Sequence, residues 1–80
     1  MAIPLYVFVQ GDTLGLVVLA PPEESVSQLA LRLARAAAPR VTLRGALRVL
    51  HRGRVLDAEL SVERAGIAPL DRVDVLGEGE

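Results

Sequence analysis

Two adjacent prolines, Pro21 and Pro22, divide the first half of this chain into segments that cannot form one continuous element. Proline has no backbone N–H, so it interrupts both a strand ladder and a helix interior. Before the prolines lie two runs rich in β-branched and aliphatic residues, 5–9 (LYVFV) and 14–19 (LGLVVL), separated by the turn sequence QGDT. This pattern predicts a β-hairpin that ends at the prolines.

The residues after the prolines predict an amphipathic helix. Ser25 and Gln28 form an S-x-x-Q capping box, the usual signature of a helix N-terminus. Apolar residues then recur at helical spacing, namely Val26, Leu29, Ala30, Leu33 and Ala37. Polar side chains occupy the opposite face, and we expect about three turns that stop at Pro39.

The second half of the chain predicts short strands and turns. Residues 39–46 form an irregular connector, and residues 47–50 and 54–56 read as a hairpin about Arg52 and Gly53. Residues 61–67 predict a short helical or 3₁₀ turn that ends at Gly66. Residues 72–76 (RVDVL) alternate as a final strand, so the predicted order is ββαββ, short turn, β.

Length and composition predict a single small domain. A chain of 80 residues buries too little surface to support two cores. It is 51% hydrophobic but only 2% aromatic, so its core must be aliphatic. The longest apolar stretch, residues 14–22, falls short of the roughly 20 residues that a membrane helix needs. The N-terminus resembles a strand and not a signal peptide, so we expect a cytoplasmic protein.

The charged residues disfavour nucleic-acid binding. The net charge is −1, and the nine basic residues are all arginines, spread from Arg32 to Arg72 without interleaved aromatic residues. The absence of lysine has two explanations. One is the codon usage of a GC-rich bacterial genome, and the other is selection against side-chain amines that can be modified.

Groups that could perform catalysis are few. Without cysteine, the chain has no disulfide, thiolate metal site or thiol nucleophile. His51 is the sole histidine and is expected to be packed in the fold, Ser25 and Ser61 resemble helix caps, and neighbouring Asp57 and Glu59 resemble solvated loop residues. We therefore predict neither catalytic residues, nor a metal site, nor a cofactor, and we expect the protein not to be an enzyme.

The order and spacing of these elements resemble ubiquitin and its relatives. In the segment LRVLHRGRVLDAELSVERAGIAPLDRVDVL, the apolar pair Val49-Leu50 precedes the turn at Gly53, and Gly66-Ile67 precedes the final strand. Val26, Leu29 and Leu33 match buried helix positions of that family. The resemblance covers nearly the whole chain and implies an α+β fold, the β-grasp, with a domain at residues 1–76 and a flexible tail at residues 77–80.

In this fold one sheet face packs on the helix, and alternate strand residues should point to it. We expect Leu5, Val7, Val17, Leu19, Val49, Val73 and Val75 on that side. The other face would then be unusually apolar. Either loops cover it, or the hairpin register is shifted by one; if neither holds, the face binds a partner or a second copy. The predicted interaction face comprises Tyr6, Phe8, Leu16, Val18, Arg48, Leu50, Arg72 and Leu76.

The resemblance implies a bacterial protein modifier that is conjugated through an isopeptide bond. Its partners would be activating and conjugating enzymes, a processing peptidase and a target protein. The conjugation tail would expose Gly77 or Gly79, which requires removal of Glu80 or a longer natural chain. Arg54 stands where ubiquitin has the lysine of its degradative chains, and the chain has no lysine elsewhere. Side-chain polymers would therefore be impossible, and we expect single copies to be attached to a target.

Two alternatives share the same fold. One is a non-conjugated interaction module, similar to the ubiquitin-like component of type VII secretion systems. The other is a sulfur carrier, which also needs a terminal diglycine. The modifier is preferred narrowly, because the chain is a free-standing domain with a glycine-bearing tail.

Overall fold

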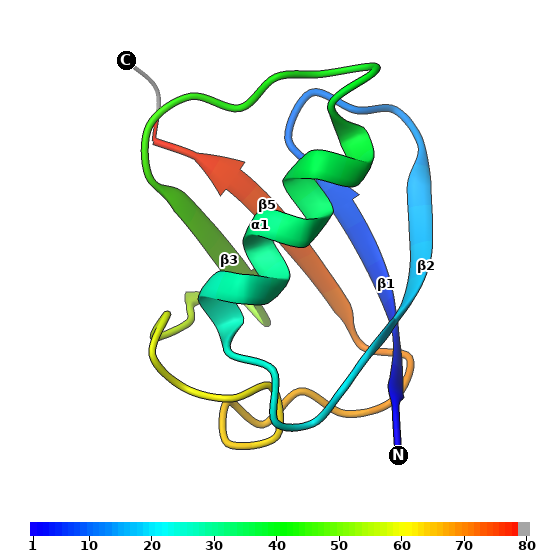
Figure 1. Cartoon of the computed structure of the whole chain (residues 1–80), viewed down its shortest axis with the longest axis vertical. Coiled ribbons are helices and arrows are strands. Elements are labelled where there is room, and N and C mark those ends of the chain that lie inside the picture. The colour runs from blue at the N-terminus through cyan, green and yellow to red at the C-terminus, as the bar shows by residue number, and fades with distance from the viewer. Residues whose placement is uncertain (79–80) are drawn as a thin grey trace.

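A computed structural model describes residues 1–78 as a five-stranded mixed sheet crossed by one helix (Figure 1). The elements are β1 (Ile3–Val9), β2 (Gly15–Ala20), α1 (Val26–Ala37), β3 (Leu47–His51), β4 (Arg54–Val55) and β5 (Arg72–Gly77). The spatial strand order is β2-β1-β5-β3-β4. This arrangement confirms the predicted α+β fold and the predicted order of its elements.

The centre of the sheet is formed by the first and last strands. β1 pairs in parallel with β5, joining Tyr6 to Arg72 and Val9 to Val75. The neighbouring pairs β1–β2, β3–β5 and β3–β4 are all antiparallel. Helix α1 lies diagonally over one face of this sheet (Figure 1).

The helix begins and ends where its sequence signals predict. The Ser25 hydroxyl accepts a hydrogen bond from the Gln28 N–H at 3.1 Å, and the Gln28 side chain accepts one from the Ser25 N–H at 3.3 Å. This reciprocal pair is the predicted capping box. All five residues of the predicted apolar stripe are buried, so the 3.6-residue periodicity located both the helix and its inner face.

The prediction for the inner face of β2 was wrong. Val17 and Leu19 were expected to face the helix, but they are 66% and 61% exposed. Leu16 and Val18, expected on the outer face, pack against the core instead. In this register Leu5 lies across from Val18, and residues directly opposite each other share one face.

The turns differ modestly from the sequence prediction. In the second hairpin, Arg52 and Gly53 both have positive φ, 55° and 79°, as a type I′ turn requires. Residues 61–67 form consecutive turns without a helix; the Ala65 N–H bonds to the Ser61 carbonyl at 2.9 Å. These turns bury Val62, whose N–H donates to the Glu24 carbonyl beside the start of α1.

A matched pair of leucines tests the corrected faces. Leu5 is fully buried, whereas Leu19 is 61% exposed. Leu5→Ala should lower the free energy of unfolding by about 2–5 kcal/mol, because it leaves a cavity. Leu19→Ala should change it by less than about 0.5 kcal/mol. Denaturant unfolding of both variants measures the difference, and equal losses would contradict the assigned faces.

Candidate protein-interaction site

The sheet face opposite α1 contains most of the predicted interaction residues. The strand registers place Tyr6 and Phe8 beside Arg72 and Asp74, and Asp74 beside Leu50. Arg48 lies across from Leu76 on the same face. Six of the eight predicted side chains thus lie together: Tyr6, Phe8, Arg48, Leu50, Arg72 and Leu76. The other two, Leu16 and Val18, point to the helix side, and Val17 and Leu19 take their place.

A polar stripe divides this outer face. The Arg72 guanidinium lies 4.2 Å from the centre of the Phe8 ring, and its Nε donates to Asp74 at 3.1 Å. The same ring covers Gly15, where a Cβ atom would lie 2.9 Å from a ring carbon. Arg72 and Asp74 therefore separate the apolar residues of β1 and β2 from Leu50, and the face is not one continuous apolar patch.

The exposed apolar residues are concentrated at the β2 side of the sheet. Leu14, just before β2, is 52% exposed, and Tyr6, which lies across from Val17, is 46% exposed. Tyr6, Val17 and Leu19 thus lie together as exposed apolar side chains on the outer face, and Leu14 adds a fourth at the start of the same strand. Sequence reasoning missed this site, because every residue in LVVL is apolar and alternation therefore carried no information about the face.

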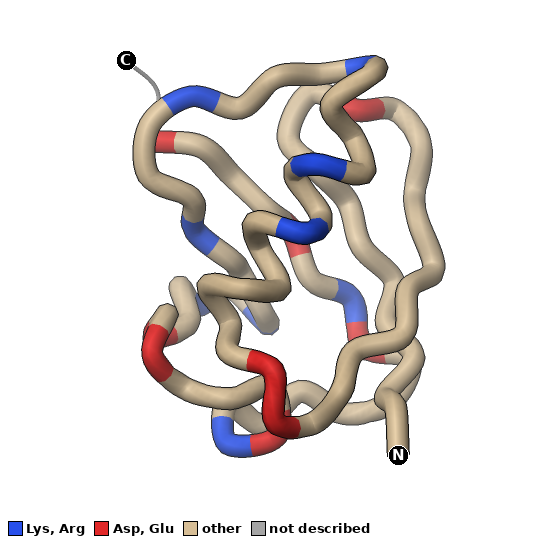
Figure 2. Tube along the Cα trace, in the orientation of Figure 1, with Lys and Arg blue, Asp and Glu red and all other residues tan. Residues whose placement is uncertain are grey.

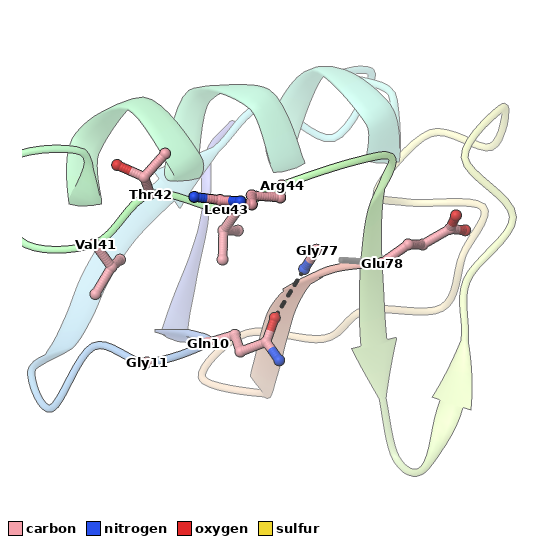
Figure 3. Close-up of a pocket in the computed structure, with 8 residues that line it drawn as sticks. All are labelled: Gln10, Gly11, Val41, Thr42, Leu43, Arg44, Gly77 and Glu78. Atoms are coloured by element: carbon pink, nitrogen blue, oxygen red, sulfur yellow. Dashed lines mark hydrogen bonds between the residues drawn. The ribbon is translucent and has the colours of Figure 1, made fainter. Parts of the chain in front are cut away.

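Neighbouring loops hydrogen-bond to the backbone at the end of β5, and in this sense the strand end is closed; Gly77 and Glu78 line a pocket together with Gln10, Gly11 and residues 41–44 (Figure 3). The Gly77 N–H donates to the Gln10 side chain at 3.0 Å, and the Glu78 N–H donates to the Ala46 carbonyl at 3.0 Å. A Cβ atom at Gly77 would lie 2.6 Å from the Arg44 carbonyl oxygen. β5 thus extends one residue past its predicted end at Leu76. Gly79, the other predicted conjugation residue, lies outside the described residues.

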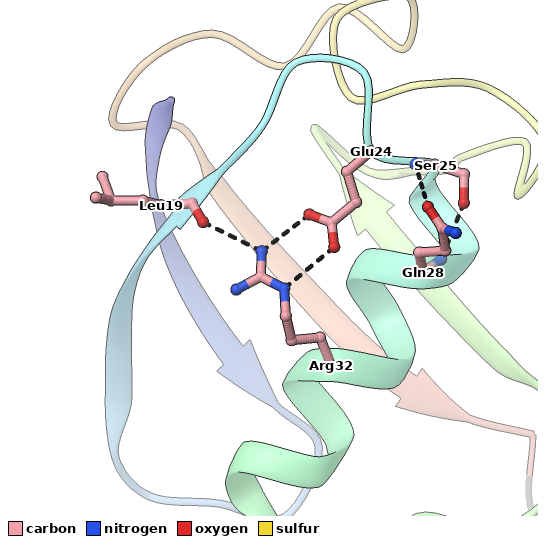
Figure 4. Close-up of polar contacts among 5 residues, drawn as sticks. All are labelled: Leu19, Glu24, Ser25, Gln28 and Arg32. Atoms are coloured by element: carbon pink, nitrogen blue, oxygen red, sulfur yellow. Dashed lines mark hydrogen bonds and ion pairs between the residues drawn. The ribbon is translucent and has the colours of Figure 1, made fainter. Parts of the chain in front are cut away.

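Two ion pairs flank β2. At one end Arg40 contacts Asp12 at 2.8 Å, and this hydrogen-bonded guanidinium lowers the pKa of the Asp12 carboxyl. At the other end Arg32 donates to both carboxylate oxygens of Glu24, at 2.9 and 3.1 Å (Figure 4). The hydrogen bonds that Arg32 donates to Glu24 raise the pKa of Arg32. The charges of these two pairs are therefore compensated within the chain.

His51 is packed in the fold, as predicted. Its Nε2 lies 2.8 Å from Asp71, whose carboxylate also accepts the Ala68 N–H at 3.0 Å. The Ala68 hydrogen bond and then the His51 contact lower the pKa of Asp71. This pair joins β3 to the loop before β5. Within residues 1–78, no three His, Asp or Glu side chains are grouped to bind a metal.

The described part of the chain also shows no helix with the length and apolar character of a membrane span. Its arrangement of sheet, helix and capped turns defines a ubiquitin-like β-grasp protein. Caldiarchaeum subterraneum ubiquitin superposes with a TM-score of 0.81 at 16% identity, covering 100% of this chain and 98% of that one. The UBL domain of Plasmodium falciparum Dsk2 gives a TM-score of 0.76 at 20% identity, covering 95% of this chain and 97% of that one.

The chain belongs to the family of Toluene-4-monooxygenase system protein B (TmoB), whose family model matches residues 2–76. A chain in the toluene 4-monooxygenase HD complex with the inhibitor 4-bromobenzoate gives a TM-score of 0.89 at 24% identity. The match covers 98% of this chain and 100% of that one. In the comparison with curated protein sequences, nothing matches this chain.

At the closed end of β5, one added methyl group at Gly77 should strongly reduce stability. Gly77→Ala should lower the free energy of unfolding by about 1–3 kcal/mol, because the added Cβ must displace the Arg44 backbone. Glu78→Ala is the control, because it keeps the backbone N–H that bonds Ala46. Thermal unfolding compares the two, and an unchanged midpoint for Gly77→Ala would show that this end of the strand is not closed.

Proposed function

We propose that this protein is a non-conjugated component of a multi-protein monooxygenase that acts on an aromatic hydrocarbon. The match of residues 2–76 to the TmoB family carries this proposal. The similar chain in the toluene 4-monooxygenase complex supports it, because this protein aligns with the full length of that chain. The protein would contribute binding surfaces and not catalytic groups.

The site geometry supports binding as the role of this chain. Its ionisable side chains with shifted pKa values form ion pairs or hydrogen bonds that hold loops and the helix in place. Three of its exposed large apolar residues, Tyr6, Val17 and Leu19, lie on the outer face of the β1–β2 hairpin. We further propose that the partners are the other proteins of the monooxygenase, in the cytoplasm of a bacterial host.

Conjugation through the C-terminus is the second candidate. The ubiquitin-like fold and the presence of Gly79 favour it, and it would require activating and conjugating enzymes and a peptidase. Gly77 is unsuited to this role, because its N–H bonds Gln10 and its α-carbon lies against the Arg44 backbone. Removal of residues 79–80 separates the two candidates.

The test is co-expression with the monooxygenase components of the same host. We expect the chain to co-elute with them, and hydroxylation of toluene to fall by at least about tenfold when it is omitted, as expected for loss of an assembly partner. A chain that ends at Glu78 should restore full activity. Assembly and turnover without the chain would contradict the proposal, and a requirement for Gly79 would favour conjugation.

A further inference from the structure

Strand β2 is an unprotected edge of the sheet. It pairs only with β1 in the sheet formed by residues 1–78, and its sequence GLVVLA contains no charge and no proline. Figure 2 shows its whole trace free of charged residues. Both of its faces are apolar, since Leu16 and Val18 pack on the core while Val17 and Leu19 are exposed. Soluble monomers usually block such edges with charges, prolines or bulges.

The opposite edge of the sheet is protected in the usual way. β4 is only two residues long, and Arg52 and Arg54 lie on either side of Gly53 in its turn. A short, charged edge is a poor template for further strand pairing. Of the two edge strands, β2 is therefore the one that lacks protection against further strand pairing.

Within residues 1–78, the backbone of β2 directs hydrogen-bonding groups away from the sheet. The Tyr6 N–H donates to the Asp71 carbonyl, and the Pro4 carbonyl accepts the Leu70 N–H. The backbone hydrogen-bonding groups of these two β1 residues therefore point away from β2. Groups alternate along an antiparallel ladder. The residues across from them, Val17 and Leu19, therefore direct their N–H and C=O groups outward from the sheet.

Arg32 occupies one of these outward groups. Its Nη2 donates to the Leu19 carbonyl at 3.1 Å, while Glu24 holds the same guanidinium from the other side (Figure 4). The outward groups of Val17 and the N–H of Leu19 remain directed away from the sheet. Because Arg32–Glu24 and Arg40–Asp12 are each internally compensated, the electrostatic complement of this edge is an uncharged segment.

We propose that the β2 edge binds an uncharged, apolar, extended segment of another protein in the monooxygenase, which adds a strand beside Val17. This inference rests on the proposed function. Added strands gain affinity from main-chain hydrogen bonds and specificity from alternate side chains. A second copy fits less well. In a two-fold pairing centred on Val17, the partner copy's Gly15 would have to lie beside both Leu19 carbonyls, where the Arg32 guanidinium is placed, whereas a segment of another protein can end before it.

Competition during assembly tests this proposal. Wild-type chain and a differently tagged variant are co-expressed with the monooxygenase components, and the isolated complex is assayed for the ratio of the two. Val17→Pro removes only an outward N–H, which an edge strand tolerates. Val17→Glu adds a charge at the same exposed position. Val55→Glu, at a position 55% exposed on the opposite edge, is the matched control.

We expect wild type to exceed Val17→Pro and Val17→Glu by about tenfold or more in the complex, and Val55→Glu to enter about equally. Circular dichroism checks that each variant is folded. If Val17→Pro is unfolded, the incorporation of Val17→Glu alone tests the proposal. Equal incorporation of a folded Val17 variant, or equal exclusion of Val55→Glu, would overturn the proposal. Failure of wild type to enter the complex would instead refute the proposed function.

Sedimentation of the chain alone tests whether a second copy of the chain occupies the β2 edge. We expect a monomer across a concentration series, because the Arg32 guanidinium lies beside each Leu19 carbonyl, where the second strand would have to pair. A dimer that Val17→Glu abolishes would overturn the choice of a different protein as the occupant and assign the edge to a second copy.

Discussion

The parallel pairing of β1 with β5 is the contact on which the rest of the structure depends. It joins residues 6–9 to residues 72–75, so the two ends of the chain form the centre of the sheet. Leu5, Val7, Val73 and Val75 are all fully buried beneath α1 as a result. Two parallel strands require a long crossover, and the intervening residues supply the helix, the second hairpin and the capped turns.

This pairing also explains the closed end of β5. Gln10 directly follows β1, so the parallel register places its side chain next to Gly77 at the end of β5. The connector before β3 then covers Gly77 from the other side. A segment that sequence reasoning treated as the start of a flexible tail is, at Gly77, part of the sheet.

Local signals predicted much of the fold. The capping box at Ser25 and the apolar stripe from Val26 to Ala37 depend on neighbours within one or two helical turns, and both were correct. The faces of β2 were not, because a strand of uniformly apolar residues has no alternation to read. Its sidedness is determined by Leu5 across the ladder. The Gln10–Gly77 contact is separated by 67 positions and has no local signature.

The same distinction applies to function. The ubiquitin-like fold is common to this chain and to structures at 16% and 20% identity, so it does not select one activity. Resemblance to ubiquitin drew attention to the C-terminal glycines. The arrangement of exposed residues draws attention to β2 instead, where an open backbone edge and apolar side chains coincide. No single residue type marked that site in the sequence.

We propose that this domain joins a monooxygenase through its β2 edge while the end of β5 stays closed. Residue-resolved hydrogen exchange, on the chain alone and within the assembled complex, tests this most directly. We expect the outward Val17 and Leu19 amides to exchange rapidly in the free chain and to become protected on assembly, while the Gly77 amide exchanges slowly in both. Unchanged exchange at Val17 and Leu19, with new protection at another surface, would contradict it.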